Sequence, residues 1–292
     1  MPEHHPLRGI FLMLLAILCF ASLDASVKYL APRIPVPILV WMRYLVHFLL
    51  MLAALGPSMG RGLLRTGKAG SLIKRSVTML LTTIFGMMAV RAMPLAEATA
   101  MIFMSPLLVA LLAGPLLKEK IGKTRWLATT VGFVGVLLIA RPGGSIALTG
   151  LLWGLATALA YAVYQIQTRH LVMTENTWVL LFYTALIGTA VTTLALPLYW
   201  VPLHPHGVDL LLLCCLGVFG GGGHFLLTRA FRFAPASTLS PLLYAQLLWA
   251  TLLGGFIFQH WPDGTSLLGM VLIVGSSLAM ALVERRGAKV AT

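Results

Sequence analysis

The chain contains ten uninterrupted apolar runs, each about as long as a helix that crosses a bilayer. A hydrocarbon core about 30 Å thick takes roughly 20 helical residues. The runs cover residues 9–30, 36–56, 76–93, 95–117, 123–141, 149–168, 177–197, 208–230, 236–258 and 264–283. They do not alternate with a period of two, which excludes a transmembrane barrel. The sequence therefore predicts an all-α polytopic membrane protein with ten transmembrane helices.

The composition agrees with this prediction and excludes several classes of protein. Of the 292 residues, 59% are hydrophobic and 10% are charged, whereas a soluble domain carries roughly 25% charged residues. A soluble enzyme, a disordered chain and a secreted disulfide scaffold are therefore excluded. The three cysteines lie within apolar runs, so they indicate neither disulfides nor a zinc site. The first run is long for a signal peptide, and we interpret it as an uncleaved helix.

The basic residues predict the orientation in the membrane. The formal net charge is +13, but Lys and Arg sit in short gaps between apolar runs, which does not indicate nucleic-acid binding. Cytoplasmic loops retain Lys and Arg. A cytoplasmic N-terminus leaves only Lys28, Arg33, Arg43, Arg91 and Arg141 for the outer side or the membrane. We therefore predict that both termini are cytoplasmic.

The two halves of the chain are similar at a shift of 141 positions. The shift lays Gly9 on Gly150, Phe20 on Tyr161, Asp24 on Gln165, Lys28 on Arg169, and the pattern Ala89, Arg91, Pro94 on Ala230, Arg232, Pro235. A shift of 140 lays Gly135 on Gly275. We interpret the chain as a duplication, with one five-helix repeat in residues 1–143 and a second in residues 144–292.

Five helices per repeat make the second copy enter the membrane from the opposite side. The paired loops favour this inversion, because residues 61–75 are rich in Lys and Arg while residues 200–208 contain neither. Inverted repeats usually build transporters, with the substrate site near the midplane where the halves meet and with transport by alternating access. The sequence therefore predicts a carrier with a central cavity.

Two segments resemble the EamA-type branch of the drug/metabolite transporter superfamily, and within it the bacterial YddG-type amino-acid exporters. They read RAMPLAEATAMIFMSPLLVALLAGPLLKEKIGKTRWLATTVGFVGVLLI and, more loosely, RFAPASTLSPLLYAQLLWATLLGGFIFQHWPDGTSLLGMVLIVGSSLAMAL. The resemblance covers nearly the whole chain. It implies ten helices in two halves, location in the bacterial inner membrane, and export of small metabolites, often amino acids.

The chain also departs from the family pattern. Pro106 and Glu119 occupy the family's proline and loop-glutamate positions in the first half, but Leu247 and His260 occupy them in the second. The small multidrug branch uses a glutamate in its first helix, and this chain offers Asp24 in that region. The resemblance therefore does not imply the cation-antiport mechanism of that branch.

Charged side chains within the first run are the first candidates for a substrate site. A charge in a bilayer costs roughly 2.5–3.5 kcal/mol on insertion scales, so it needs a partner or a function. Asp24 and Lys28 are four positions apart and face one another on a helix. They either clamp a zwitterion, with Asp24 on the ammonium and Lys28 on the carboxylate, or they satisfy each other while Lys28 extends to water.

Polar side chains on other runs are expected to line the same cavity. In run 149–168, Tyr161 and Gln165 share a helix face, and either line a cavity or bond to other helices. Run 208–230 contains four consecutive glycines followed by His224 and Thr228, and His224 overlies Thr83 by the repeat. His224 either binds a substrate carboxylate or proton, or bonds to a neighbouring carbonyl.

The remaining candidates are apolar, aromatic or helix-breaking residues. They are Met79 and Met101, whose flexible side chains suit apolar substrates, Tyr244 and Gln246 of run 236–258, and the internal prolines Pro106 and Pro241. Each proline either frees a carbonyl for substrate or only kinks its helix. Arg91 and Glu97 flank the turn after run 76–93, and form either an outer gate with Lys28 or an ordinary exposed pair.

These observations predict an inner-membrane exporter of small, mainly neutral amino acids. Its expected partners are the lipid bilayer and the amino-acid substrate, without cofactor, metal or nucleic acid, and a monomer and a homodimer both remain open. One alternative is a carrier of other solutes or anions such as drugs or sugar phosphates, which needs several cations at the midplane. Another is an intramembrane lipid-modifying enzyme, which needs a nucleophile with a base.

Overall fold

The computed structural model describes residues 6–117, 123–140, 147–172, 174–202, 205, 207–234 and 239–290. Every regular element in these ranges is helical, which confirms the predicted all-α fold. Glu119, Arg141 and Pro235 lie outside the described residues.

The helices of the first half are α1 (Pro6–Leu30), α2 (Val36–Met59), the short 3-10 helix η1 (Gly60–Leu64), α3 (Ala69–Ala92), α4 (Leu95–Ile102), α5 (Ser105–Leu117) and α6 (Lys123–Ile139). Those of the second half are α7 (Leu148–Leu171), α8 (Thr177–Tyr199), α9 (Gly207–Phe233), the 3-10 helix η2 (Ser240–Tyr244), α11 (Ala245–Phe258) and α12 (Gly264–Val290). Side-chain caps mark two of the starts. Asn176 accepts a hydrogen bond from the Trp178 amide at 2.9 Å, and Asp263 accepts one from the Ser266 amide at 2.8 Å.

Seven of these helices are long and apolar enough to cross a bilayer, namely α1, α2 with η1, α3, α7, α8, α9 and α12. Three shorter apolar segments, Leu95–Val109, Trp126–Ile139 and Leu242–Phe258, correspond to the other three predicted runs. The described residues therefore contain seven candidate spans, whereas the sequence predicted ten full-length helices.

The predicted run 95–117 is interrupted, which is one reason for the lower count. Helix α4 ends at Ile102, and α5 starts at Ser105. The amides of Phe103 and Met104 bond to the carbonyls three residues back, as in a tighter turn. Pro106 has no amide hydrogen, and its ring would clash with the carbonyl of Ile102, which is four residues earlier. The second half has a similar irregularity, because Pro241 lies in η2 before α11 starts.

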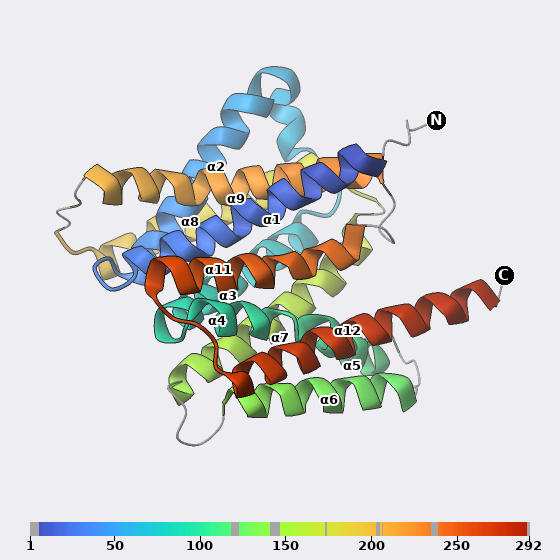
Figure 1. The fold of residues 1–292 in the computed structure, drawn as a ribbon. Helices are drawn as coiled ribbons and strands as arrows, with labels where there is room; N and C mark the ends of the chain where they lie inside the picture. The colour runs from blue at the N-terminus through green and yellow to red at the C-terminus, as the bar shows by residue number, and fades with distance from the viewer. Residues whose placement is uncertain are drawn as a thin grey trace.

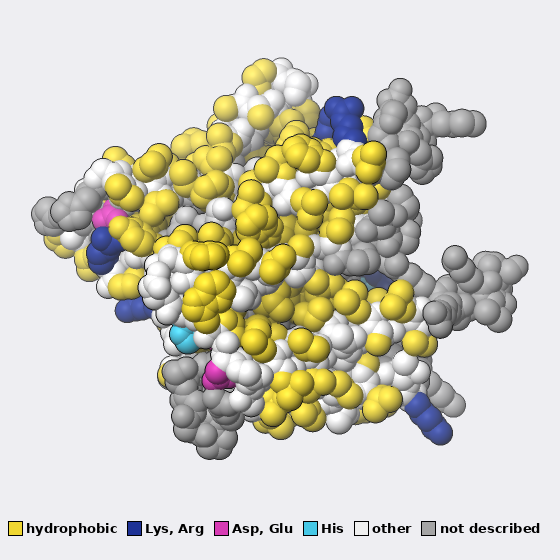
Figure 2. Space-filling model, in the orientation of Figure 1, with side chains coloured by type: hydrophobic (Ala, Val, Ile, Leu, Met, Phe, Trp, Pro, Cys, Tyr) yellow, Lys and Arg dark blue, Asp and Glu magenta, His cyan; other side chains and the backbone are white. Residues whose placement is uncertain are grey.

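The surface agrees with a bilayer environment. Helix α1 starts and α12 ends at the same end of the bundle, where both termini lie (Figure 1). Figure 2 shows hydrophobic side chains over most of the face formed by α1, α11 and α12, while charged side chains gather towards the two ends of the helices. Leu194 and Leu198 on α8 are 82% and 79% exposed. Such an extensive apolar surface requires lipid rather than water around it.

The helices of the two halves pack in reciprocal pairs. Helix α1 lies against α9, α7 lies against α3, and α6 lies against α12. Glycines mark the close approaches. A Cβ atom added to Gly9 would lie 2.7 Å from Cβ of Ala234, and one added to Gly150 would lie 3.1 Å from Cβ of Met93. The shift of 141 converts the first contact into the second.

The crossing of α6 and α12 is the tightest of these contacts through the backbone. A Cβ atom on Gly135 would lie 2.6 Å from the carbonyl oxygen of Gly269. Gly275, which the sequence comparison laid on Gly135, has nothing within 4 Å of its added Cβ atom. Gly135 therefore packs against Gly269, six residues before its repeat counterpart Gly275.

Candidate functional site

Two of the hydrogen bonds that join the halves in the interior are related by the repeat. The side-chain amide of Gln246 on α11 donates to the Asp24 carboxylate on α1 at 3.2 Å. The side-chain amide of Gln165 on α7 donates to the Ser105 hydroxyl on α5 at 3.1 Å. The shift of 141 converts Asp24 to Gln165 and Ser105 to Gln246, so each bond is the repeat counterpart of the other. Equivalent residues therefore make equivalent contacts with the roles of the halves exchanged.

Aromatic rings accompany these two hydrogen bonds. Phe103 and Tyr244 precede Ser105 and Gln246 by two positions, and their ring centroids are 4.9 Å apart. The shift of 141 converts Phe103 to Tyr244, so this contact joins two equivalent positions of the two repeats. The ring of Phe20 on α1 meets the His224 ring of α9 edge-on at 5.1 Å. The interior thus has apolar ring surface beside its polar groups.

Arg43 supplies a positive charge to the same region. This half-buried residue of α2 donates a hydrogen bond from its guanidinium to the Thr83 hydroxyl of α3. The Tyr44 hydroxyl lies 2.9 Å from the same Thr83 oxygen, and Arg43 lies 5.5 Å from the centroid of the Tyr44 ring. Arg43 is close enough to Asp24 to interact with it electrostatically. We call Asp24, Arg43, Thr83, Ser105, Gln165 and Gln246 the central polar cluster.

Lys28 does not take part in the cluster. Its ammonium donates to the carbonyl of Met93, 2.8 Å away, and so points towards the α3–α4 turn and away from Asp24. The predicted Asp24–Lys28 pair is therefore replaced by two separate contacts. Within the described residues, neither Asp24 nor Arg43 has an ion-pair partner at salt-bridge distance. The two charges are left available to a ligand with groups of opposite charge.

Arg75 is a polar residue that the sequence analysis assigned to an inner loop. Helix α3 starts six residues earlier, so Arg75 lies within the bundle with only 2% of its surface exposed. It donates to the hydroxyls of Tyr164, Thr168 and Thr184 at 2.6, 2.8 and 2.9 Å, and to the Leu180 carbonyl at 3.1 Å. This network ties α3 to α7 and α8. The sequence signal that could have placed Arg75 in a helix is the spacing of Arg75, Met79 and Thr82, which are four and three positions apart.

The glycine run of α9 makes room for side chains of α1 and α2. A Cβ atom on Gly221 would lie 2.7 Å from the His47 ring, and one on Gly223 would lie 2.6 Å from the Phe20 ring. Nothing lies within 4 Å of a Cβ atom on Gly222. His47 is buried, and its Nε2 atom has no hydrogen-bond partner in the described part of the chain. Close packing of helices is the role of these glycines.

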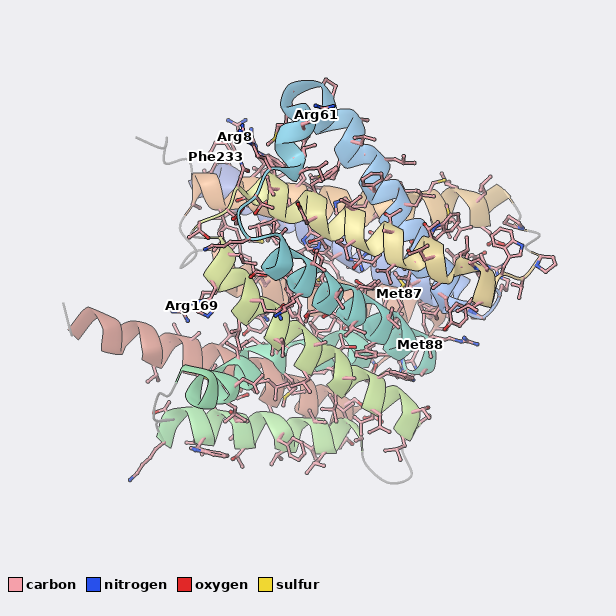
Figure 3. All side chains as sticks on the ribbon, turned by 180° about the vertical axis from the view of Figure 1, so that it is seen from behind. Arg8, Arg61, Met87, Met88, Arg169 and Phe233 are labelled. Atoms are coloured by element: carbon pink, nitrogen blue, oxygen red, sulfur yellow. The ribbon has the colours of Figure 1, made fainter. Side chains whose placement is uncertain are left out.

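The other predicted residues have varied surroundings. Thr228 donates to the His224 carbonyl at 2.8 Å, and Tyr161 stacks on Tyr164 with centroids 5.8 Å apart. Met79 is buried, and Met101 is fully buried against Gly154 of α7, so Met101 belongs to the packed core. Figure 3 shows Met87 and Met88 of α3 at the opposite end of the molecule from Arg8 and Arg169.

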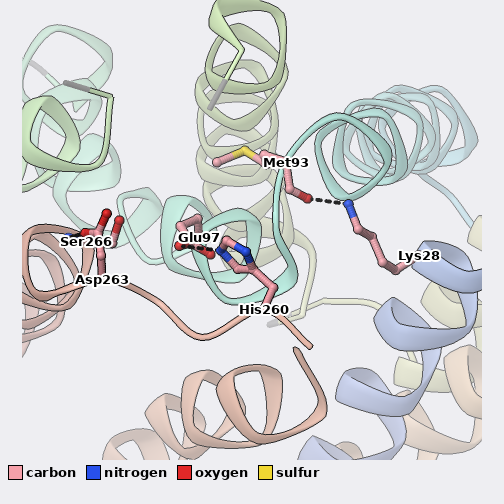
Figure 4. Close-up of polar contacts among 6 residues, drawn as sticks. All are labelled: Lys28, Met93, Glu97, His260, Asp263 and Ser266. Carbon is pink, nitrogen blue, oxygen red and sulfur yellow. Dashed lines mark hydrogen bonds and ion pairs between the residues drawn. The ribbon is translucent and has the colours of Figure 1, made fainter. Parts of the chain in front are cut away.

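A separate polar group lies where α4 meets the α11–α12 connection (Figure 4). Glu97 is 2% exposed, and its Oε1 atom lies 3.5 Å from Nε2 of His260, whose side chain is 39% exposed. Arg91 is exposed, so the predicted Arg91–Glu97 pair is replaced by Glu97–His260. The reason is geometric: Glu97 is in the first turn of α4 and contacts the α11–α12 connection, whereas Arg91 is in the last turn of α3.

The described residues contain no cluster of metal ligands, and one pocket lies apart from the central polar cluster. No group of three or more His, Cys, Asp or Glu side chains there could hold a metal ion. A pocket of about 290 Å³ opens between α1, α9 and α11, and its walls include Ala25, Leu212, Phe219 and Leu253. Its lining is apolar and excludes the central polar cluster. The chemistry available in the cluster is binding of charged and hydrogen-bonding groups.

Comparison with known proteins identifies related chains. The model of the EamA-like transporter family matches residues 7–141 and again residues 148–282. The S-adenosylmethionine uptake transporter of Rickettsia felis is 28% identical over 96% of this chain and 94% of its own length. The riboflavin transporter of Vibrio cholerae is 28% identical over 93% and 92%. The pseudopaline exporter of Pseudomonas aeruginosa is 28% identical over 95% and 97%.

A solved crystal structure has a similar fold. It superimposes with a TM-score of 0.66 at 24% identity, over 95% of this chain and 98% of the other. The similarity therefore extends over both halves of the chain.

Proposed function

Because the chain belongs to the EamA-like transporter family of the drug/metabolite transporter superfamily, we propose that it carries small amino acids out of the cell across the bacterial inner membrane. Its relatives are named as transporters and not as enzymes. The lipid-modifying enzyme considered from the sequence is therefore set aside. The proposal concerns the substrate, its binding site and the direction of transport.

The observation that carries the proposal is the unpaired arrangement of Asp24 and Arg43. The two opposite charges lie on α1 and α2, which both pack against α9. They interact electrostatically, and each is held by a neutral partner from another helix. An amino acid has an ammonium group for Asp24 and a carboxylate for Arg43. Hydrogen bonds to charged groups contribute roughly 1.5–3 kcal/mol each. Phe20, Tyr161 and the Phe103–Tyr244 pair would contact the side chain of the substrate.

Two repeats of opposite orientation would give this site access to both sides of the membrane. The reciprocal bonds Asp24–Gln246 and Gln165–Ser105 support a two-fold relation between residues 1–143 and 144–292. The shared end of the two termini supports an even number of crossings, and the two matches to the family model support equal halves (Figure 1). An odd number of helices per half then inverts the second repeat, as alternating access requires.

The basic residues support a cytoplasmic location for the end that contains both termini. Arg8, Lys68 and Arg169 lie in the parts of the chain nearest this end, and the positive-inside rule assigns such an end to the cytoplasm. Reporter fusions to the C-terminus test this orientation. Activity of a cytoplasmic reporter is expected, and activity of a periplasmic reporter alone would contradict it.

Uptake of S-adenosylmethionine is the second candidate, and the name of the Rickettsia felis relative favours it. S-adenosylmethionine contains an amino-acid head group, which would bind Asp24 and Arg43 in the same way. Its adenine would stack on the aromatic rings beside the cluster, as bases stack on aromatic side chains elsewhere. The two candidates differ in the size of the substrate and in the direction of transport.

Transport by the purified protein in lipid vesicles tests both candidates. Labelled leucine, threonine, phenylalanine, S-adenosylmethionine and riboflavin are each offered outside and, separately, preloaded inside. Saturable movement of amino acids supports the proposal, and saturable movement of S-adenosylmethionine alone supports the second candidate. Movement of riboflavin alone, or of none of the five compounds, would contradict recognition of an amino-acid head group.

A further inference from the structure

Glu97 is a buried acidic residue, and one of its carboxyl oxygens has no hydrogen-bond partner in the described part of the chain. Its carboxyl group is 98% buried at the start of α4, and the oxygen without a partner is Oε2. Its Oε1 atom lies 3.5 Å from Nε2 of His260, and the carboxyl group also accepts a hydrogen bond from the backbone amide of Glu97 itself. An ionised carboxylate with an unsatisfied oxygen is costly to bury, whereas a protonated carboxyl loses most of that cost.

His260 connects this buried carboxyl group to the aqueous side. It follows the end of α11, where Gln259 adopts a left-handed conformation with φ 54°, and its side chain is 39% exposed. Figure 4 shows the Nε2 atom of this partly exposed ring directed towards Glu97. An imidazole changes its charge near neutral pH and is the common proton carrier in proteins.

Two other charged residues interact with Glu97, and both have partners of their own. Lys28 of α1 and Asp263 of the α11–α12 connection interact with it electrostatically. Lys28 is held by the Met93 carbonyl, and Asp263 caps α12. Arg91 of α3, six residues before Glu97, is exposed, and α11 has no charged residue in its sequence. Arg169 and His170 are in the last turn of α7, whereas Glu97 is in the first turn of α4.

We propose that Glu97 and His260 form a proton-binding site that couples transport to the proton gradient. A proton passes from water to His260 and then from its Nε2 atom to the Oε1 atom of Glu97, so that His260 returns to its neutral form and Glu97 becomes neutral. Neutral Glu97 no longer attracts His260, which loosens the contact between α4 and the α11–α12 connection. Release of the proton to the opposite side of the membrane, after the change of conformation has opened the site there, leaves Glu97 ionised, restores the contact and moves one proton across the bilayer.

This inference rests on the chain being a carrier, but not on which substrate it carries. Helix α4 continues into the interrupted segment that leads to Ser105 of the central polar cluster. A change in the contact at the start of α4 therefore acts on the same segment that contains Ser105, the hydrogen-bond partner of Gln165. Protonation and substrate binding would bias one element, which is the physical requirement for coupling.

Vesicle transport with and without an imposed proton gradient tests the site. Glu97→Gln keeps the shape of the side chain and mimics the protonated form. The variant is expected to exchange labelled substrate but to lose accumulation driven by the gradient, from several-fold to none. His260→Gln, at an exposed position, is expected to slow driven transport about tenfold or more without changing the KM for substrate.

Glu175→Gln is the matched control. Glu175 accepts a hydrogen bond from Thr66 at 2.9 Å in the connection between α7 and α8, and the proposal gives it no role. This variant should keep both exchange and driven accumulation. Full accumulation by Glu97→Gln would overturn the proposal, as would accumulation by the wild type under a sodium gradient but not a proton gradient.

A measurement without substrate separates this proposal from the proposed function. Trp261 follows His260 directly and packs against Phe256, with ring centroids 5.3 Å apart, so its fluorescence reports on this connection. The emission of the wild type should change with pH, and the change should be absent in Trp261→Phe and altered in Glu97→Gln. The same pH response in wild type and Glu97→Gln would contradict the site, even if no transported substrate is found.

Discussion

The carboxylate of Asp24 accepts a hydrogen bond from the side-chain amide of Gln246 at 3.2 Å, which ties α1 of the first half to α11 of the second. Its repeat counterpart, Gln165 with Ser105, has the same geometry but no charge. The duplication therefore preserved the contact while the chemistry diverged. The first half contributes both charges of the central polar cluster, the carboxylate of Asp24 and the guanidinium of Arg43.

Replacing Asp24 by Asn tests the ammonium site. Asn keeps the size of the side chain and can still accept a hydrogen bond from Gln246, so the fold should be preserved. Loss of the negative charge removes a charge-assisted hydrogen bond, and we expect the KM for substrate to rise about 10- to 100-fold. Transport kinetics in vesicles provide the measurement. Asp209→Asn is the control, because Asp209 pairs with Arg33 at 3.0 Å outside the cluster. An unchanged KM in Asp24→Asn would remove Asp24 from the site.

Two replacements of Arg43 separate charge from geometry. Arg43→Gln removes the cation, and we expect a loss of affinity similar to that of Asp24→Asn. Arg43→Lys keeps the charge but loses the planar group that bonds to Thr83, so an intermediate loss is expected. Binding of a substrate analogue that lacks its carboxylate should be insensitive to both changes. Equal behaviour of Arg43→Gln and the exposed control Arg91→Gln would contradict the assignment.

Arg75→Met tests the buried hydrogen-bond network near the start of α3. The change leaves the hydroxyls of Tyr164, Thr168 and Thr184 without their donor. Unsatisfied buried polar groups cost about 1–3 kcal/mol each, so we expect the melting temperature in detergent to fall by roughly 5–10 °C. The exposed Arg65→Met variant should melt like the wild type. A stable Arg75→Met protein would show that α3 does not depend on these bonds.

Two glycines on the α6–α12 pair offer a matched comparison. Gly135→Ala brings a methyl group to 2.6 Å from the Gly269 carbonyl oxygen, so the helices must separate. Overpacking of this kind costs about 1–3 kcal/mol. Gly275→Ala meets open space, and its stability should equal or slightly exceed that of the wild type, because Ala favours helix. Thermal unfolding of both variants distinguishes the packing in the structure from the Gly135–Gly275 equivalence of the sequence.

Local signals in the sequence were reliable where the property is additive along the chain. The apolar runs correctly predicted an all-helical membrane protein, and the similarity of the segments quoted above correctly indicated its family. The length of each helix was less well predicted. Pro106 divides α4 from α5, and α3 starts seven residues before its apolar run because Lys74 and Arg75 are helical as well.

The contacts of individual side chains were predicted poorly. Asp24 and Lys28 are one helical turn apart, yet Asp24 binds Gln246 and Lys28 binds the Met93 carbonyl. Glu97 was expected beside Arg91 and lies beside His260. In each case the side chain contacts a residue from a distant part of the chain instead of its charged neighbour in the sequence.

The sequence by itself determined that this protein lies in a membrane, that it is helical and that its halves are related. These properties follow from hydrophobicity and periodicity, which each residue contributes independently of its distant neighbours. Only the tertiary structure decided which polar groups meet. That outcome depends on how each helix is rotated about its own axis and where glycines allow close approach, and both are set by packing against helices that are distant in the sequence.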